Sequence, residues 1–141
     1  MRRFFKKSKP DVAPVAAGNN GVTVLIVDDS PTELHLIRNI LVQGGYQVIT
    51  AENGEAGVEE ATRLQPDIIL MDVVMPGLNG FQATRQLSRA PETASIPIIM
   101  VTTKGQETDR AWGLRQGARE YVVKPVAAED LLGKISMVMS G

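Results

Sequence analysis

The stretch VLIVDDSPTELHLI, residues 24–37, contains the transition that decides the fold. Its first four residues are apolar and predict a buried strand, and the spacing of leucines and isoleucines after Pro31 indicates a helix. Ser30 and Glu33 predict a capping box at the start of that helix. Two aspartates, Asp28 and Asp29, lie between strand and helix. Charged carboxylates are costly beside an apolar core, so their position requires an explanation.

Length and composition indicate one globular domain. The chain has 141 residues, of which 43% are hydrophobic and 22% charged, as in ordinary globular proteins. It has no cysteine, which excludes disulfides and thiolate metal sites. No apolar run approaches the roughly 20 residues of a membrane-spanning helix. We therefore expect a cytoplasmic protein without a transmembrane segment.

The charge is distributed unevenly along the chain. The first nine residues hold five basic side chains and no acidic one, whereas the remainder holds 10 basic and 16 acidic side chains. Residues 1–21 combine this charge with proline, glycine and asparagine, which predicts a disordered basic leader. An arm that docks on an anionic surface is the alternative. Residues 22–141, which hold all but one of these acids, are the expected folded domain, and their negative charge argues against nucleic acid as a partner.

From residue 22 onward, strand-like and helical patterns alternate. Strand-like runs lie at 22–28, 46–51, 67–72, 96–102 and 119–123, and helical patterns at 34–41, 53–65, 81–89, 106–116 and 128–139. Apolar strands that alternate with helices predict an α/β fold, a doubly wound parallel sheet of five strands covered on both faces. Ligands bind such sheets at the carboxyl ends of the strands.

Residues with reactive or charged side chains follow four of these strands. They are Asp28 and Asp29 after the first, Asp72 after the third, Thr102 at the end of the fourth and Lys124 after the fifth. Each alone has an ordinary explanation, such as a helix N-terminus or a turn. Their coincidence at one edge favours a site. Two carboxylates about 4 Å apart repel by about 4 kcal/mol, so such a cluster retains a proton or binds a cation.

Oxygen ligands of this kind suit Mg²⁺. Three acids and one lysine carry a charge of −2, which one divalent ion neutralises. A metal beside a further carboxylate indicates phosphoryl chemistry, with Asp72 as the nucleophile that forms an acyl phosphate. The added charge would attract Lys124 and the Thr102 hydroxyl. Tyr121, on the adjacent strand, could fill the space that Thr102 leaves.

As a set, these motifs resemble the response-regulator receiver family, the CheY-like domains. The motifs are VDDS (27–30), MDVVMPGLNG (71–80), VTT (101–103) and YVVKP (121–125), within a match over about residues 22–140. The resemblance implies the flavodoxin-like (βα)5 strand order 2-1-3-4-5. It also implies a stand-alone receiver, and residues 102–125 are similar to twitching-motility regulators of the PilH type.

The resemblance also implies the roles of the acidic residues. Asp72 becomes the phosphoacceptor. Asp28 and Asp29 become the acidic pair for Mg²⁺, with Asp29 as the expected direct ligand of the two. Asp72 and the backbone carbonyl of Val74 complete the protein's ligands. The apolar Val74 side chain cannot position a nucleophilic water, which predicts a long-lived phosphoryl group.

The remaining positions match the switch and phosphoryl-binding residues of the family. By resemblance, Thr102 and Tyr121 are the switch pair, Lys124 contacts the phosphoryl group, and the peptide bond between Lys124 and Pro125 is cis.

The implied function is that of a phosphoacceptor switch in a phosphorelay, not an enzyme. A CheA-like histidine kinase is the expected donor. A downstream protein is expected on the face of helix 106–116, strand 119–123 and helix 128–139. Three alternatives stay open: a phosphate sink for a shared kinase, an Mg²⁺-dependent aspartyl-phosphate phosphatase, and a flavin carrier. The phosphatase lacks a second acid at Val74 and a cap insertion, and a flavin carrier leaves the acidic cluster unexplained.

Overall fold

The computed structural model describes residues 21–141, in which five strands and five helices alternate. The strands are β1 (Thr23–Val27), β2 (Gln47–Ala51), β3 (Ile68–Met71), β4 (Ile98–Thr102) and β5 (Glu120–Val123). The helices are α1 (Pro31–Gln43), α2 (Gly54–Leu64), α3 (Gly80–Arg89), α4 (Glu107–Gln116) and α5 (Ala128–Ser140). The leader expected at 1–21 lies, apart from Gly21, outside the described residues.

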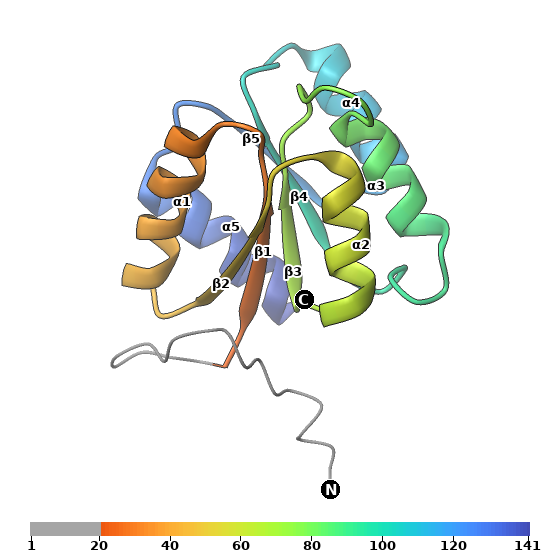
Figure 1. Ribbon diagram of the computed structural model, residues 1–141. Coiled ribbons are helices and arrows are strands. Elements are labelled where there is room, and N and C mark those ends of the chain that lie inside the picture. The colour runs from red at the N-terminus through yellow and green to blue at the C-terminus, as the bar shows by residue number, and fades with distance from the viewer. Residues whose placement is uncertain (1–20) are drawn as a thin grey trace, which may run out of the picture.

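All strand pairs are parallel, and the sheet order is β2-β1-β3-β4-β5. The predicted doubly wound fold and its strand order are therefore confirmed. Helices α1 and α5 cover one face of the sheet, and α2, α3 and α4 cover the other (Figure 1). The chain runs from β1 outward to β2 and then returns to β3 on the other side of β1. The strand order thus reverses beside β1, where doubly wound folds bind ligands.

The covering of both faces explains why β1 is apolar from Val24 to Val27. Leu25 and Val27 belong to the core beneath α2 and α3, whereas Val24 and Ile26 belong to the core beneath α1 and α5. Successive strand side chains point to opposite faces, so each core receives alternate residues. All residues of β1 are consequently buried, and the strand ends where the first aspartate follows.

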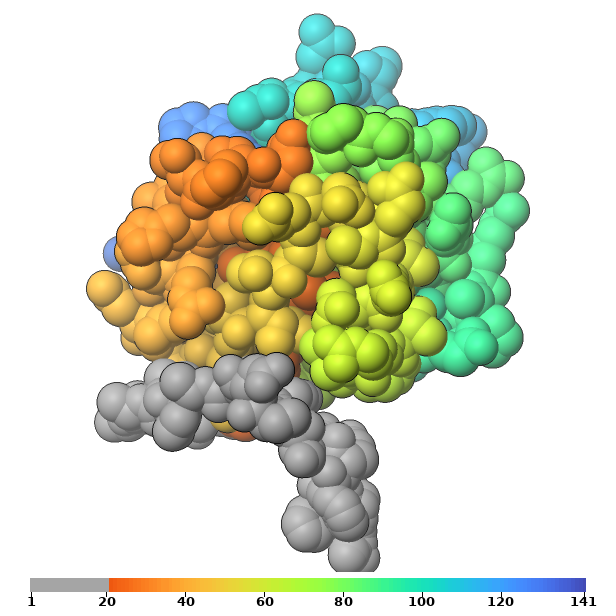
Figure 2. Space-filling model, in the orientation of Figure 1, coloured from red at the N-terminus to blue at the C-terminus, as the bar shows by residue number. Residues whose placement is uncertain are grey.

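At the surface, β2 is an edge strand, and residues of α1, β2 and α2 form much of the face in Figure 2. No helix within residues 21–141 has the length and apolar character needed to cross a membrane.

The start of α1 differs from the predicted capping box. The Ser30 hydroxyl accepts the backbone N–H of Glu33 at 3.3 Å, as predicted. The backbone N–H of Ser30, however, donates to Asp28 Oδ1 at 2.9 Å. Because Asp28 occupies the position that the Glu33 carboxylate takes in a capping box, only half of the box forms. The carboxylate of Glu33 is therefore available for other contacts.

The backbone after β3 packs closely against its neighbours. A Cβ atom at Gly80 would overlap with the carbonyl oxygen of Asp72 and lie 2.7 Å from Val73 Cα. A Cβ atom at Gly54 would overlap with the carbonyl oxygen of Leu78. Both obstacles are backbone atoms, which cannot rotate away as a side chain can. The start of α3 and the start of α2 therefore fix the path of the loop that follows Asp72.

Replacing Gly80 by alanine should lower the free energy of unfolding by about 1–3 kcal/mol, because the methyl group overlaps with this backbone. Gly133 in α5 is the matched control, since a Cβ atom there meets no atom within 4 Å. Gly133→Ala should raise stability by up to about 1 kcal/mol through helix propensity. Urea unfolding followed by circular dichroism measures both. Equal changes in the two variants would contradict the close packing at Gly80.

Candidate functional site

The register of β1 and β3 brings three carboxylates together at the carboxyl edge of the sheet. Val27 pairs with Met71, so Asp28 and Asp72 follow at equivalent places on neighbouring strands. One oxygen each from Asp28, Asp29 and Asp72 lies within 4.8 Å of the others. Asp28 and Asp72 are 1% and 7% exposed, whereas Asp29 faces solvent. The structure thus gathers the acids that the sequence analysis placed at these strand ends.

Lys124 reaches the same pocket from the end of β5, two strands away from β3. Its Nζ lies 2.7 Å from Asp28 Oδ2 and 3.4 Å from Asp72 Oδ2, and its side chain is 7% exposed. The backbone N–H of Lys124 donates to the carbonyl oxygen of Thr102 at 2.8 Å. The peptide bond from Lys124 to Pro125 is cis. The ammonium group is the cation that compensates the buried acids in this structure.

Thr102 and Tyr121 are linked through the backbone of Lys104. Both side chains are buried, and the Lys104 N–H donates to Thr102 Oγ1 at 3.3 Å. The Tyr121 hydroxyl donates to the carbonyl oxygen of Lys104 at 2.7 Å. Burial raises the pKa of Tyr121 to about 12, so this hydroxyl keeps its proton at neutral pH. A displacement of Thr102 or of Tyr121 therefore disturbs the backbone of Lys104, to which both side chains are hydrogen-bonded.

The charged groups in the pocket shift one another's pKa values. Burial and the repulsion of Asp28 raise the pKa of Asp72, and the charge of Lys124 and two hydrogen bonds partly offset this rise. One of these bonds comes from the backbone N–H of Val73, 2.7 Å from Asp72 Oδ1. Burial lowers the pKa of Lys124, but the hydrogen bond to Asp28 and the surrounding carboxylates outweigh burial and raise it. The lysine therefore stays charged at neutral pH.

Glu33 is a fourth acid at the pocket, where the sequence predicted only a role in the helix cap. Its Oε1 lies 3.8 Å from Lys124 Nζ. This oxygen is buried and has no hydrogen-bond partner within residues 21–141. The available signal was its place in the first turn of α1, directly beside the end of β1. That signal is weak, because the same position is favourable for capping.

The donor set of the pocket fits a hard divalent cation. Mg²⁺ prefers oxygen ligands and is held by one or two carboxylates together with water and phosphate, and three carboxylates converge here. Val74 follows Asp72 by two residues, and its side chain is 55% exposed. It lines a shallow pocket together with Lys104, Asn79 and neighbouring apolar residues. The role of the Val74 carbonyl as a metal ligand stays a prediction.

Fold and site together define a class: doubly wound α/β domains with an acidic pocket at the strand-order reversal, closed by a lysine from the last strand. Comparison with known proteins identifies the family within this class. Residues 24–136 match the response regulator receiver domain, and the chain belongs to this family. The receiver family functions as phosphoacceptor switches in two-component signalling.

Individual relatives agree with this assignment. The chain is 58% identical to the protein PilH of Pseudomonas aeruginosa over 118 residues, which cover 84% of this chain and 98% of PilH. It is 35% identical to the phosphate regulon transcriptional regulatory protein PhoB of Escherichia coli over 82% of this chain, but spans only 51% of PhoB. The predicted resemblance to receivers of the PilH type is therefore confirmed.

A solved structure shows the same fold. The receiver domain of the sensor histidine kinase PA1611 from Pseudomonas aeruginosa has a magnesium ion coordinated in its active site cleft. It resembles this chain with a TM-score of 0.79 and 30% sequence identity, over 85% of this chain and 98% of that domain.

In magnesium-free buffer, Lys124→Met should lower the free energy of unfolding by about 3–5 kcal/mol, because buried carboxylates lose their cation. Lys134→Met is the matched control. It removes a more exposed pair with Asp130 and should cost less than about 1 kcal/mol. Urea titration measures both values. Added Mg²⁺ should restore part of the loss in Lys124→Met alone, and similar losses in both variants would refute the compensating role of Lys124.

Proposed function

We propose that this protein is a response regulator that accepts a phosphoryl group from a histidine kinase on Asp72, with Mg²⁺ held by Asp28, Asp29 and Asp72. The observation that carries the proposal is the convergence of these three carboxylates, two of which, those of Asp28 and Asp72, also contact the ammonium group of Lys124. A buried carboxylate beside a metal site and a cation has what an acyl-phosphate nucleophile needs. The backbone carbonyl of Val74 is the further proposed ligand.

In the proposed reaction, a carboxylate oxygen of Asp72 forms a bond to phosphorus as the bond from phosphorus to the donor histidine nitrogen breaks. The electron pair of the broken bond stays on the imidazole. Bound Mg²⁺ would neutralise charge on the transferring phosphoryl group. Lys124 Nζ lies 3.4 Å from Asp72 Oδ2, so the ammonium group is placed to donate to phosphoryl oxygens. The N–H of Val73 holds the other oxygen of the nucleophile.

Phosphorylation would then act on the switch pair Thr102 and Tyr121. It takes Asp72 from about −1 to about −2 and adds acceptor oxygens. The Thr102 hydroxyl would turn toward these oxygens and leave the N–H of Lys104, whose carbonyl holds Tyr121. Hydrogen bonds to a charged group contribute about 1.5–3 kcal/mol each, so two of them supply about 3–6 kcal/mol, compared with the about 5.5 kcal/mol that inverts a 1:99 population. An active state that is already partly populated before phosphorylation would lower this requirement.

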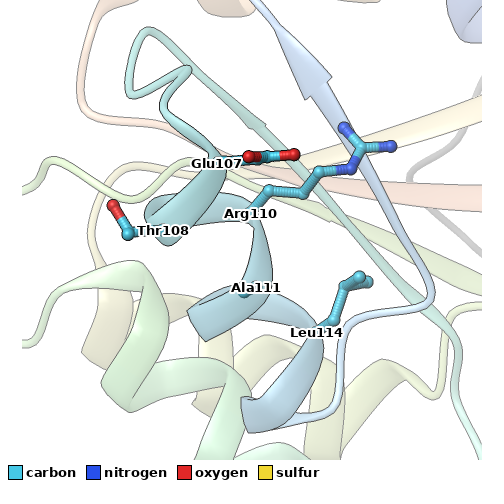
Figure 3. A pocket seen from close by; sticks show the side chains of 5 residues that line it. All are labelled: Glu107, Thr108, Arg110, Ala111 and Leu114. Carbon is cyan, nitrogen blue, oxygen red and sulfur yellow. The ribbon is translucent and has the colours of Figure 1, made fainter.

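The proposed output surface is the face formed by α4, β5 and α5. Glu107, Arg110 and Leu114 project from the same side of α4 and line a shallow pocket (Figure 3). Leu114 and Val123 of β5 are each 43% exposed, which adds apolar surface. The guanidinium carbon of Arg110 lies 5.9 Å from the ring centre of Tyr121. The surface is thus in contact with a residue of the switch pair.

The likeness to PilH supports a place in type IV pilus twitching signalling, with a CheA-like histidine kinase as the donor. We assign the receiver to residues 22–141 and the protein to the cytoplasm. The excess of acidic side chains after the first nine residues supports a protein as the downstream partner rather than nucleic acid.

Incubation with Mg²⁺ and acetyl phosphate should add one phosphoryl group to the protein, observed by intact mass spectrometry. Asp72→Asn and removal of Mg²⁺ with a chelator should each abolish the adduct, because one removes the nucleophile and the other its metal. The control Asp130→Asn changes an exposed acid on α5 and should leave the adduct unchanged. An adduct that forms equally in Asp72→Asn would refute the assignment of the phosphoacceptor.

Val74→Asn should shorten the half-life of the phosphorylated protein several-fold, because an amide beside Asp72 can position a water that valine cannot. Val42→Asn on α1 is the control, since it makes the same exchange at another exposed valine and should not change the decay. The remaining adduct is followed by mass spectrometry after the donor is removed. An equal decay rate in both variants would contradict the predicted effect of Val74 on the lifetime of the phosphoryl group.

A further inference from the structure

The contacts of Glu33 separate it from an ordinary helix-capping glutamate. In a capping box its carboxylate would accept the backbone N–H of Ser30, but that N–H donates to Asp28 Oδ1. Glu33 Oε1 instead lies 3.8 Å from Lys124 Nζ, buried and without a hydrogen bond within the described part of the chain. A buried carboxylate oxygen without a hydrogen bond is costly. Its position beside the acidic pocket therefore points to a role there.

Glu33 also changes the charge of the site. Asp28, Asp29, Asp72 and Glu33 together with Lys124 carry a formal charge of −3, not the −2 that the sequence analysis counted without Glu33. A divalent ion then leaves the pocket at −1 instead of neutral. The fourth acid thus provides more negative potential than the three aspartates alone.

We propose that Glu33 is a positioning residue of the magnesium site, whose carboxylate shares Lys124 with Asp28 and Asp72 and strengthens Mg²⁺ binding without being a ligand. This inference rests on the proposed function, because it requires that the aspartates bind the ion. It adds a residue outside the predicted ligand set.

Two physical effects of Glu33 act in the same direction. Its charge adds attraction for a divalent cation entering the pocket. Its carboxylate also competes with Asp28 and Asp72 for the ammonium group of Lys124, at 3.8 Å against 2.7 and 3.4 Å. An ammonium group that is partly drawn to Glu33 opposes the incoming ion less. Glutamine at this position would lose both effects, so the two need not be separated for the test.

Isothermal titration of the full chain with Mg²⁺ at low ionic strength tests the proposal. Glu33→Gln should raise the Kd for Mg²⁺ about fivefold to tenfold, since it removes one charge near a divalent ion. Glutamine is also favourable at this helix position, so the start of α1 is preserved. The difference from the unmodified protein should shrink at high salt, because screening weakens the field of a partly exposed group. A purely structural role of Glu33 would not respond to salt in this way.

Two further variants test whether the charge of Glu33 itself matters, rather than the shape of its side chain or the net charge of the protein. Glu33→Asp keeps the charge and should keep most of the affinity. Glu92→Gln removes one exposed acid between α3 and β4, at the opposite edge of the sheet, and should leave Kd unchanged. Equal affinity of Glu33→Gln and the unmodified protein overturns the proposal, as does an equal loss in Glu33→Asp or Glu92→Gln. Absence of Mg²⁺ binding by the unmodified protein refutes the magnesium site of the proposed function itself.

Discussion

The parallel pairing of β1 with β3 forces two aspartates into one buried place, and the rest of the site depends on this constraint. Asp28 and Asp72 directly follow the paired residues Val27 and Met71, so neither can move away without a break in the register. Like charges about 4 Å apart repel by about 4 kcal/mol at a protein surface and by more where water is excluded. Lys124 compensates them from β5, which makes the pocket a junction of the first, third and last strands.

Lys124 compensates only part of the negative charge in the pocket, and the remaining negative charge accounts for the proposed chemistry. One ammonium group faces several carboxylates, so the pocket retains capacity for a further cation. Once Asp72 gains a phosphoryl group, Lys124 and Thr102 would acquire a stronger acceptor than their present partners. Because Thr102 and Tyr121 both bond to the backbone of Lys104, this exchange has a direct route to the surface of α4 and β5. Charge balance and conformational switching are thus two consequences of one arrangement.

The sequence predicted the parts of the site that directly follow regular strands. Strand ends in a parallel sheet converge by geometry, so the strand pattern alone was enough to place Asp28, Asp72 and Lys124 at one edge. The role of Glu33 could not be predicted in this way. It depends on whether Asp28 or Glu33 accepts the backbone N–H of Ser30, and both carboxylates are close to it in sequence. The bridge through Lys104 uses main-chain atoms, which every residue carries and no sequence pattern reveals. The strand order came from family resemblance, since alternation of strands and helices alone permits several orders.

A crystal structure of the protein grown with Mg²⁺ tests the central claim most directly. The account predicts one octahedral ion in the pocket of Asp28, Asp29 and Asp72 at the carboxyl edge of β1 and β3. Asp29, Asp72 and the backbone carbonyl of Val74 are its direct ligands at about 2.0–2.1 Å, and water fills the remaining positions. An ion bound elsewhere, or a pocket in which saturating Mg²⁺ leaves the three aspartates without a metal, would contradict it.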